Sequence, residues 1–282
     1  MIPLLAQLGG LRIYTYGVFL MLGFFWACFF VWKYIRISKF AEEETFDIVF
    51  TAFGGALLVG RLVYGFLHFD EFGFDILHYL LVNGYPGMST VGMLLGGAIT
   101  LYLVCSNKKI SIAEFVDYIT PSLFLFVAVA ELGAFFAGIE PGVRIGWYRH
   151  PLALYKALLF GVGMYGAIQL LFAVRKDKHT KGVSAIFFIW GYSLVTVALF
   201  RLADPRVVQT TNTIEQWTYV ILLLTSSFYI VYYFRVFVGT MFRSFINWNA
   251  TYVKTAVRSF PQKSEGKNRR GDEKSKKPDR KS

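Results

Sequence analysis

The chain of 282 residues has little charge and almost no cysteine. Charged residues make up 17% of it, against 55% hydrophobic residues, and cysteine occurs only at Cys28 and Cys105. Both cysteines fall inside or at the end of separate apolar segments, which excludes a disulfide framework and favours packing as small apolar side chains. No internal repeat is visible, so nothing suggests a transporter built from repeated halves.

The chain instead contains long apolar runs. A helix that crosses a bilayer needs about 20 mostly apolar residues. Seven runs approach or exceed that length: Tyr14–Val31, Phe46–Leu67, Met88–Val104, Val116–Ala137, Leu152–Val174, Val183–Leu202 and Trp217–Phe237. The sequence therefore predicts an all-α, polytopic membrane protein with seven transmembrane helices. We expect no cleavable signal peptide, because the first run has neither a basic n-region nor a small-residue cleavage site.

The net charge of +11 does not indicate a nucleic-acid partner, because the excess lies in the tail and in the connections on one side of the membrane. Loops with many lysines and arginines face the cytoplasm, which places the N-terminus outside and the C-terminus inside. The basic connections carry Lys33, Arg36, Lys39, Lys108, Lys109, Arg175, Lys176, Lys178 and Lys181, and the opposite side carries Arg12, Arg144, Arg149 and Arg206.

Three regions follow from this pattern. Residues 1–238 form the seven-helix transmembrane domain. Residues 239–260 place apolar side chains at helical spacing with basic ones between them, which predicts an amphipathic helix on the cytoplasmic leaflet. Residues 261–282 are rich in Lys, Arg, Ser and Gly, and we expect a disordered basic tail attracted to anionic lipid.

One polar turn opens the fifth run. Arg149 and His150 precede Pro151, which fits a helix start, so both side chains lie where the membrane surface begins. Two hydrogen-bond donors at a bilayer interface suit a lipid phosphate. They also suit an interfacial anchor beside a helix start, and the chemistry alone favours the anchor.

Four ionisable residues fall at membrane depth, where such groups are functional candidates. Arg61, Lys156 and Arg201 can extend to the outer interface. Glu131 lies deeper in the fourth run, and it either pairs with Arg61 or Lys156 or serves in catalysis.

The third run begins with many glycines, from Gly84 to Gly97. Small residues permit close helix packing, and unwound backbone there could instead bind a phosphate; packing is favoured. The connection His68–Pro86 holds histidines and acids, but their spacing matches no metal motif, so a solvated loop and no metal are expected.

In this order, the motifs resemble the bacterial phosphatidylglycerol–prolipoprotein diacylglyceryl transferases from about Leu8 to Val238. The matching segments are Tyr16-Gly17, Gly60-Arg61-x-x-Tyr64, Gly87-Met88-Ser89-x-x-Gly92-x-x-x-Gly96, Asp117-x-x-x-Pro121, Arg149-His150-Pro151-x-x-Leu154-Tyr155, Gly191-Tyr192 and Pro205.

The resemblance implies transfer of a diacylglyceryl group from phosphatidylglycerol to the thiol of a lipobox cysteine in a prolipoprotein, in the bacterial plasma membrane and without a cofactor. It assigns catalysis to His150 as the remaining candidate base. Substrate binding falls to Tyr16, Arg61, Gly92, Arg149, Tyr192 and Arg201.

The chain departs from the family pattern at polar positions. Val91 replaces a histidine, Glu131 a phosphate-binding arginine, Ala134 and Ala137 two asparagines, and Thr196 and Phe200 an arginine and a glutamate. These losses argue for an alternative: a catalytically degenerate relative that binds phospholipid or lipoprotein precursor without transfer.

Overall fold

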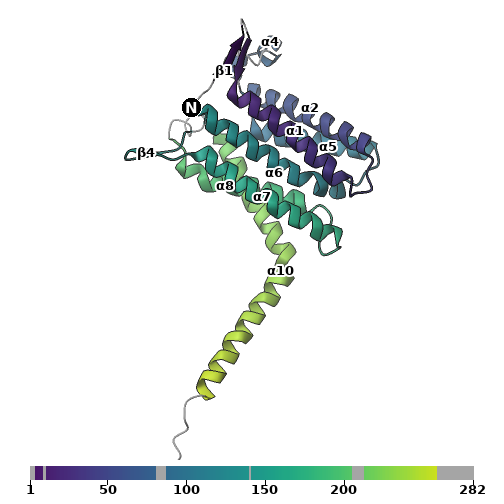
Figure 1. The fold of residues 1–282 in the computed structure, drawn as a ribbon, viewed down its shortest axis with the longest axis vertical. Helices are drawn as coiled ribbons and strands as arrows, with labels where there is room; N and C mark the ends of the chain where they lie inside the picture. Colours follow the sequence, from purple (N-terminus) through teal and green to yellow (C-terminus); the bar gives the residue numbers. More distant parts are fainter. Residues whose placement is uncertain (1–3, 9–10, 81–86, 140, 205–212, 259–282) are drawn as a thin grey trace, which may run out of the picture. The chain divides into compact units, whose positions relative to one another are not determined.

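The computed structural model describes residues 4–8, 11–80, 87–139, 141–204 and 213–258. Within these residues, seven helices are long and apolar enough to cross a membrane, which confirms the all-α prediction (Figure 1). They are α1 (Thr15–Ile35), α2 (Glu42–Leu67), α5 (Thr90–Asn107), α6 (Ile112–Ala137), α7 (Leu152–Arg175), α8 (Val183–Leu199, extended by the 3-10 turn η1, Phe200–Leu202) and the first part of α10 (Thr213–Arg258).

Helix α6 is the centre of the unit formed by Met1–Ile230. It packs against α1 on one side and α7 on the other, while α8 contacts both α6 and α7. Half of its most apolar window is buried, a larger share than in any other span among the described residues. The largest core side chains include Phe115, Phe124 and Phe160, which are at most 1% exposed. Burial of these rings supplies much of the packing energy that orders the spans.

Helices α2 and α5 approach each other through glycines. A Cβ atom added to Gly92 would lie 2.7 Å from the Cβ of Val63, and one added to Gly96 would lie 2.4 Å from the Cβ of Val59. Side chains at these positions would push the two backbones apart. The structure therefore supports the packing interpretation of the glycine-rich third span.

Small elements gather at one end of the bundle. We call this end the N-side, because α1, α5, α7 and α10 begin there and α2, α6 and α8 end there; the charge pattern predicts that it faces outward. It carries the hairpin of β1 (Leu4–Leu8) and β2 (Leu11–Tyr14), the short helices α3 (Phe69–Phe72) and α4 (Ile76–Leu80), and the hairpin of β3 (Arg144–Ile145) and β4 (Tyr148–Arg149).

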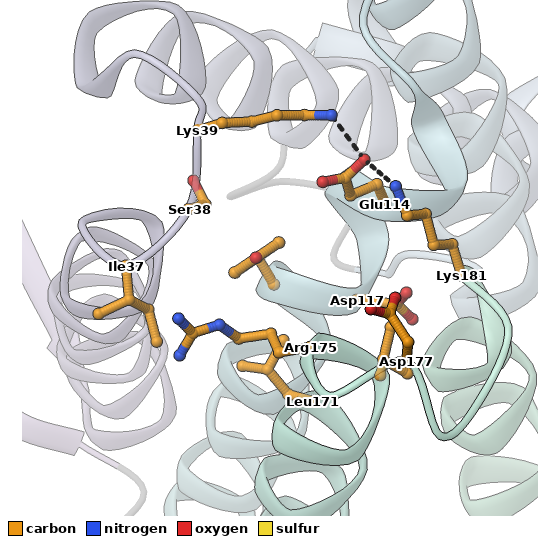
Figure 2. Close-up of a pocket in the computed structure, with 11 residues that line it drawn as sticks. Ile37, Ser38, Lys39, Glu114, Asp117, Leu171, Arg175, Asp177 and Lys181 are labelled. Atoms are coloured by element: carbon orange, nitrogen blue, oxygen red, sulfur yellow. Dashed lines mark hydrogen bonds and ion pairs between the residues drawn. The ribbon is translucent and has the colours of Figure 1, made fainter.

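The opposite end of the bundle holds a network of charges around a depression of about 280 Å³ (Figure 2). Glu114 accepts from Lys39 at 2.9 Å and from Lys181 at 2.8 Å, and this carboxylate raises the pKa of the Lys181 amine. One turn further along α6, the buried Asp117 accepts backbone N–H groups of Gly182 at 2.7 Å and of Ser184 at 3.1 Å. Asp117 therefore satisfies two of the unpaired N–H groups at the start of α8.

Helix α10 continues past Phe237, where the predicted seventh span ends. It runs without interruption from Thr213 to Arg258, because a single glycine, Gly239, is tolerated inside a helix. The segment from Val231 forms a second unit. The placement of residues 239–260 on a membrane surface stays a prediction, and the basic tail, residues 261–282, lies outside the described residues.

Candidate functional site

A backbone network ties the N-side ends of α6, α7 and α8 together. The N–H of Gly142 donates to the carbonyl of His150, and the N–H of His150 donates back to Val143, both at 3.2 Å. Val143 also donates to Leu202 at 2.8 Å, and Asp204 donates to Pro141 at 3.1 Å. The loop before α7 is thereby held between the start of that helix and the end of α8.

This network fixes the two polar residues that the sequence singled out. Arg149 donates to the carboxylate of Asp204 at 3.0 Å, and about half of its side chain remains exposed. The His150 Nδ1 lies 3.4 Å from the hydroxyl of Tyr155, one turn into α7. Arg149 and His150 therefore lie just before α7, a helix long and apolar enough to cross a membrane, and the Asp204 carboxylate neutralises part of the arginine charge.

Arg61 lies elsewhere and is fully engaged by backbone. Its guanidinium donates to the carbonyls of Gly87 at 2.7 Å, His78 at 2.8 Å and Tyr79 at 3.1 Å, and its carbon Cζ lies 4.9 Å from the centre of the Phe72 ring. The residue is 5% exposed. In this arrangement Arg61 ties the end of α4 to Gly87, just before α5, and a phosphate would have to displace those carbonyls.

Glu131 pairs with one of the two partners expected for it. Its carboxylate lies 3.7 Å from the amine of Lys156, and the two side chains are 15% and 14% exposed. An ion pair shielded from solvent in this way joins α6 to α7 two turns from the end of α6.

The remaining sequence candidates, Tyr16, Tyr192 and Arg201, lie in α1, in the middle of α8 and in η1. Tyr16 lies close to α6, where a Cβ on Gly133 would be 3.5 Å from its ring. The ring of Tyr192 stacks on Phe160, with centroids 5.5 Å apart, and lies 6.0 Å from the ring of Tyr219. Arg201 is exposed within η1.

Gly92 and Thr196 make hydrogen bonds within or at the start of their own helices. The N–H of Gly92 donates to the Ser89 hydroxyl at 3.1 Å, so this glycine serves the start of α5 as well as its packing. Thr196, which stands where the family has an arginine, donates its hydroxyl to the carbonyl of Tyr192 at 2.9 Å.

One polar contact was missed by the sequence reasoning. Ser89 is completely buried, and its hydroxyl donates to the carboxylate of Glu215 in the first turn of α10. The only sequence signal was an acidic residue just before an apolar run, which ordinarily marks a helix start. A contact between residues 126 positions apart leaves no pattern in a single sequence.

These observations define a polytopic membrane protein with several of its candidate polar residues at one end of a bundle of seven helices that are long and apolar enough to cross a membrane. The family model of the prolipoprotein diacylglyceryl transferases matches residues 3–232, and the chain belongs to that family.

Curated relatives extend the match. The phosphatidylglycerol–prolipoprotein diacylglyceryl transferase of Idiomarina loihiensis is 30% identical over 220 residues, covering 72% of this chain and 82% of the relative. Those of Streptococcus pneumoniae (strain JJA) and Clostridium tetani are 25% and 27% identical; they cover 82% and 72% of this chain and 93% and 86% of the relatives. The similarity therefore includes nearly the whole length of these enzymes.

Proposed function

We propose that this protein transfers the diacylglyceryl group of phosphatidylglycerol to the lipobox cysteine of prolipoproteins, in the bacterial plasma membrane with the N-side facing outward. The observation that carries the proposal is the fixed pair Arg149 and His150. Backbone hydrogen bonds on both sides of His150 hold this pair at the entry of a membrane span. That is where the headgroup of an outer-leaflet lipid would lie.

The chemistry assigns a task to each group. Arg149 binds the lipid phosphate, exchanging part of its interaction with Asp204 for a second anion. A guanidinium suits this task because its planar donors match phosphate oxygens. His150, whose imidazole can both accept and donate a proton, exchanges a proton at the same headgroup. Tyr16 in α1, Tyr192 midway along α8 and Arg201 in η1 contribute to substrate binding.

A second candidate function rests on the ion pair of Glu131 and Lys156. A carboxylate at this position neutralises the adjacent lysine, whereas the resemblance expects an arginine there. A protein with this pair would bind phospholipid or lipoprotein precursor while transferring nothing. Its lipid phosphate would then be held by Arg149 alone, at the edge of the bundle.

Mass spectrometry of a peptide thiol separates the two functions. The full chain in detergent would be mixed with phosphatidylglycerol and a lipobox peptide, beside a family member of known activity. Transfer predicts a diacylglyceryl thioether on the cysteine. Arg149→Ala and His150→Ala should each reduce its rate by about 10²–10⁴, while Lys108→Ala at the opposite end leaves it unchanged.

Binding measurements decide the remaining outcome. If the control enzyme modifies the peptide and this chain does not, yet it retains phosphatidylglycerol in an Arg149-dependent way, the non-transferring function is correct. Absence of both transfer and binding would refute both candidates.

A further inference from the structure

The contact between Ser89 and Glu215 lies in the part of the bundle that has lost its family acid–base groups. Val91, in the histidine position, is two residues after Ser89 at the start of α5. Phe200, in the glutamate position, directly follows α8 as the first residue of η1. Glu215 lies in the first turn of α10, and Tyr219, one turn later, lies against Tyr192 of α8. The carboxylate therefore belongs to the face of α10 that meets α5 and α8.

The local structure orients this carboxylate. It occupies the first turn of α10, where the helix dipole stabilises a negative charge. The Ser89 hydroxyl that donates to it is itself fixed, because its oxygen accepts from the N–H of Gly92 at 3.1 Å and its own N–H donates to Gly60 at 3.1 Å. One oxygen of Glu215 is thus engaged, and a carboxylate has lone pairs on two oxygens.

We propose that Glu215 is the base that accepts the proton of the substrate thiol; the inference rests on the transfer function proposed above. The carboxylate removes the S–H proton as the sulfur attacks the glycerol carbon that carries the phosphate. A carbon–sulfur bond forms, and the carbon–oxygen bond to phosphate breaks. Its electron pair leaves with the oxygen of glycerol phosphate. The proton passes from Glu215 to that product or to water, so the carboxylate is regenerated.

This role is complementary to that of His150. The histidine acts beside Arg149 at the lipid phosphate, and Glu215 acts at the thiol. Such a division explains how a chain with Val91 and Phe200 at two acid–base positions retains the reaction. Removing a positioned base reduces rates by about 10²–10⁴.

Glu215→Gln is the decisive variant. Glutamine keeps the size of the side chain and an oxygen that accepts from Ser89, but it cannot accept the thiol proton. The substrate supplies the second arm of the test: a lipobox peptide with selenocysteine in place of cysteine carries a selenol that is already ionised at neutral pH. Asp47→Asn is the matched control, because Asp47 is an exposed carboxylate paired with Lys108 at the opposite end.

If Glu215 is the base, E215Q should lower kcat for the cysteine peptide by about 10²–10⁴. KM for phosphatidylglycerol and the rate for the selenocysteine peptide should stay within about threefold of wild type. Equal losses with both peptides would assign Glu215 a purely structural role and overturn the inference, as would undiminished transfer to cysteine by E215Q. If wild type modifies neither peptide while the control enzyme is active, the transfer function is refuted, and this role with it.

Discussion

Arg61 offers a sharp test of the structure, because a buried guanidinium with three carbonyl partners should be worth more to stability than to lipid binding. Hydrogen bonds to charged groups contribute about 1.5–3 kcal/mol each. In a variant that lacks the guanidinium, water at the end of the bundle would hydrogen-bond the three freed carbonyls and offset part of this loss. We expect Arg61→Met to lower the free energy of unfolding by about 3–5 kcal/mol, near the upper end for single substitutions.

Arg61→Lys is the matched comparison. The lysine keeps the positive charge, but its compact ammonium cannot reproduce the fork that reaches Gly87, His78 and Tyr79 together. Its stability should fall between those of wild type and Arg61→Met. Unfolding in mixed micelles gives the free energies, and hydrogen exchange over residues 68–80 should rise in the same order.

The opposite result has a clear meaning. If both variants unfold like wild type within about 1 kcal/mol but lose affinity for phosphatidylglycerol, then Arg61 binds substrate and its carbonyl contacts are incidental. That outcome would restore the role that family resemblance assigns to this arginine.

Two other predictions concern packing and helix capping. Gly92→Ala should lower the free energy of unfolding by about 1–3 kcal/mol, the usual penalty of overpacking. Gly97→Ala, whose new Cβ would lie 3.4 Å from its nearest neighbour, should be neutral or stabilising. Equal thermal stability of the two variants would contradict the close approach of α2 and α5. Asp117→Ala should cost about 2–4 kcal/mol by removing two charge-assisted bonds, whereas Glu114→Ala should cost under about 1 kcal/mol, since both its lysines are more than half exposed; denaturation curves in the reverse order would refute the capping role.

The sequence predicted the spans well on the N-side, where α2 and α6 end at the expected Leu67 and Ala137 and α7 begins at the expected Leu152. At the opposite end it fell short. Helix α2 begins at Glu42, four residues before the predicted Phe46, because the acidic residues of its first turn favour a helix start although they lower the hydropathy. Apolar runs therefore mark the part of a helix that lies in lipid, and helices extend beyond it.

The side-chain contacts of the site were less predictable than the spans. Sequence chemistry identified Arg61 as a candidate cation at membrane depth that could extend to the outer interface, but it predicted neither the burial of this side chain nor its partners, the backbone carbonyls of His78, Tyr79 and Gly87. For Glu131 it offered two partners, and only the packing of α6 against α7 selects Lys156. The Ser89–Glu215 contact needs α10 beside α5, which depends on how the last span folds back.

The substitutions in this chain fall on chemistry and spare packing. Gly92 and Gly96 still allow α2 to approach α5, and Asp117 still caps α8, so the residues that assemble the bundle are retained. The changes to Val91, Glu131 and Phe200 instead remove or reverse polar groups on three helices that meet at the N-side. In the same region the chain has a carboxylate at Glu215 and an ion pair at Lys156, which supply charge in new places. A bundle kept intact around rearranged charges is expected for either proposed function, because both transfer and lipid binding need the close packing at Gly92 and Gly96. Modification of the lipobox peptide is therefore the measurement that decides between them.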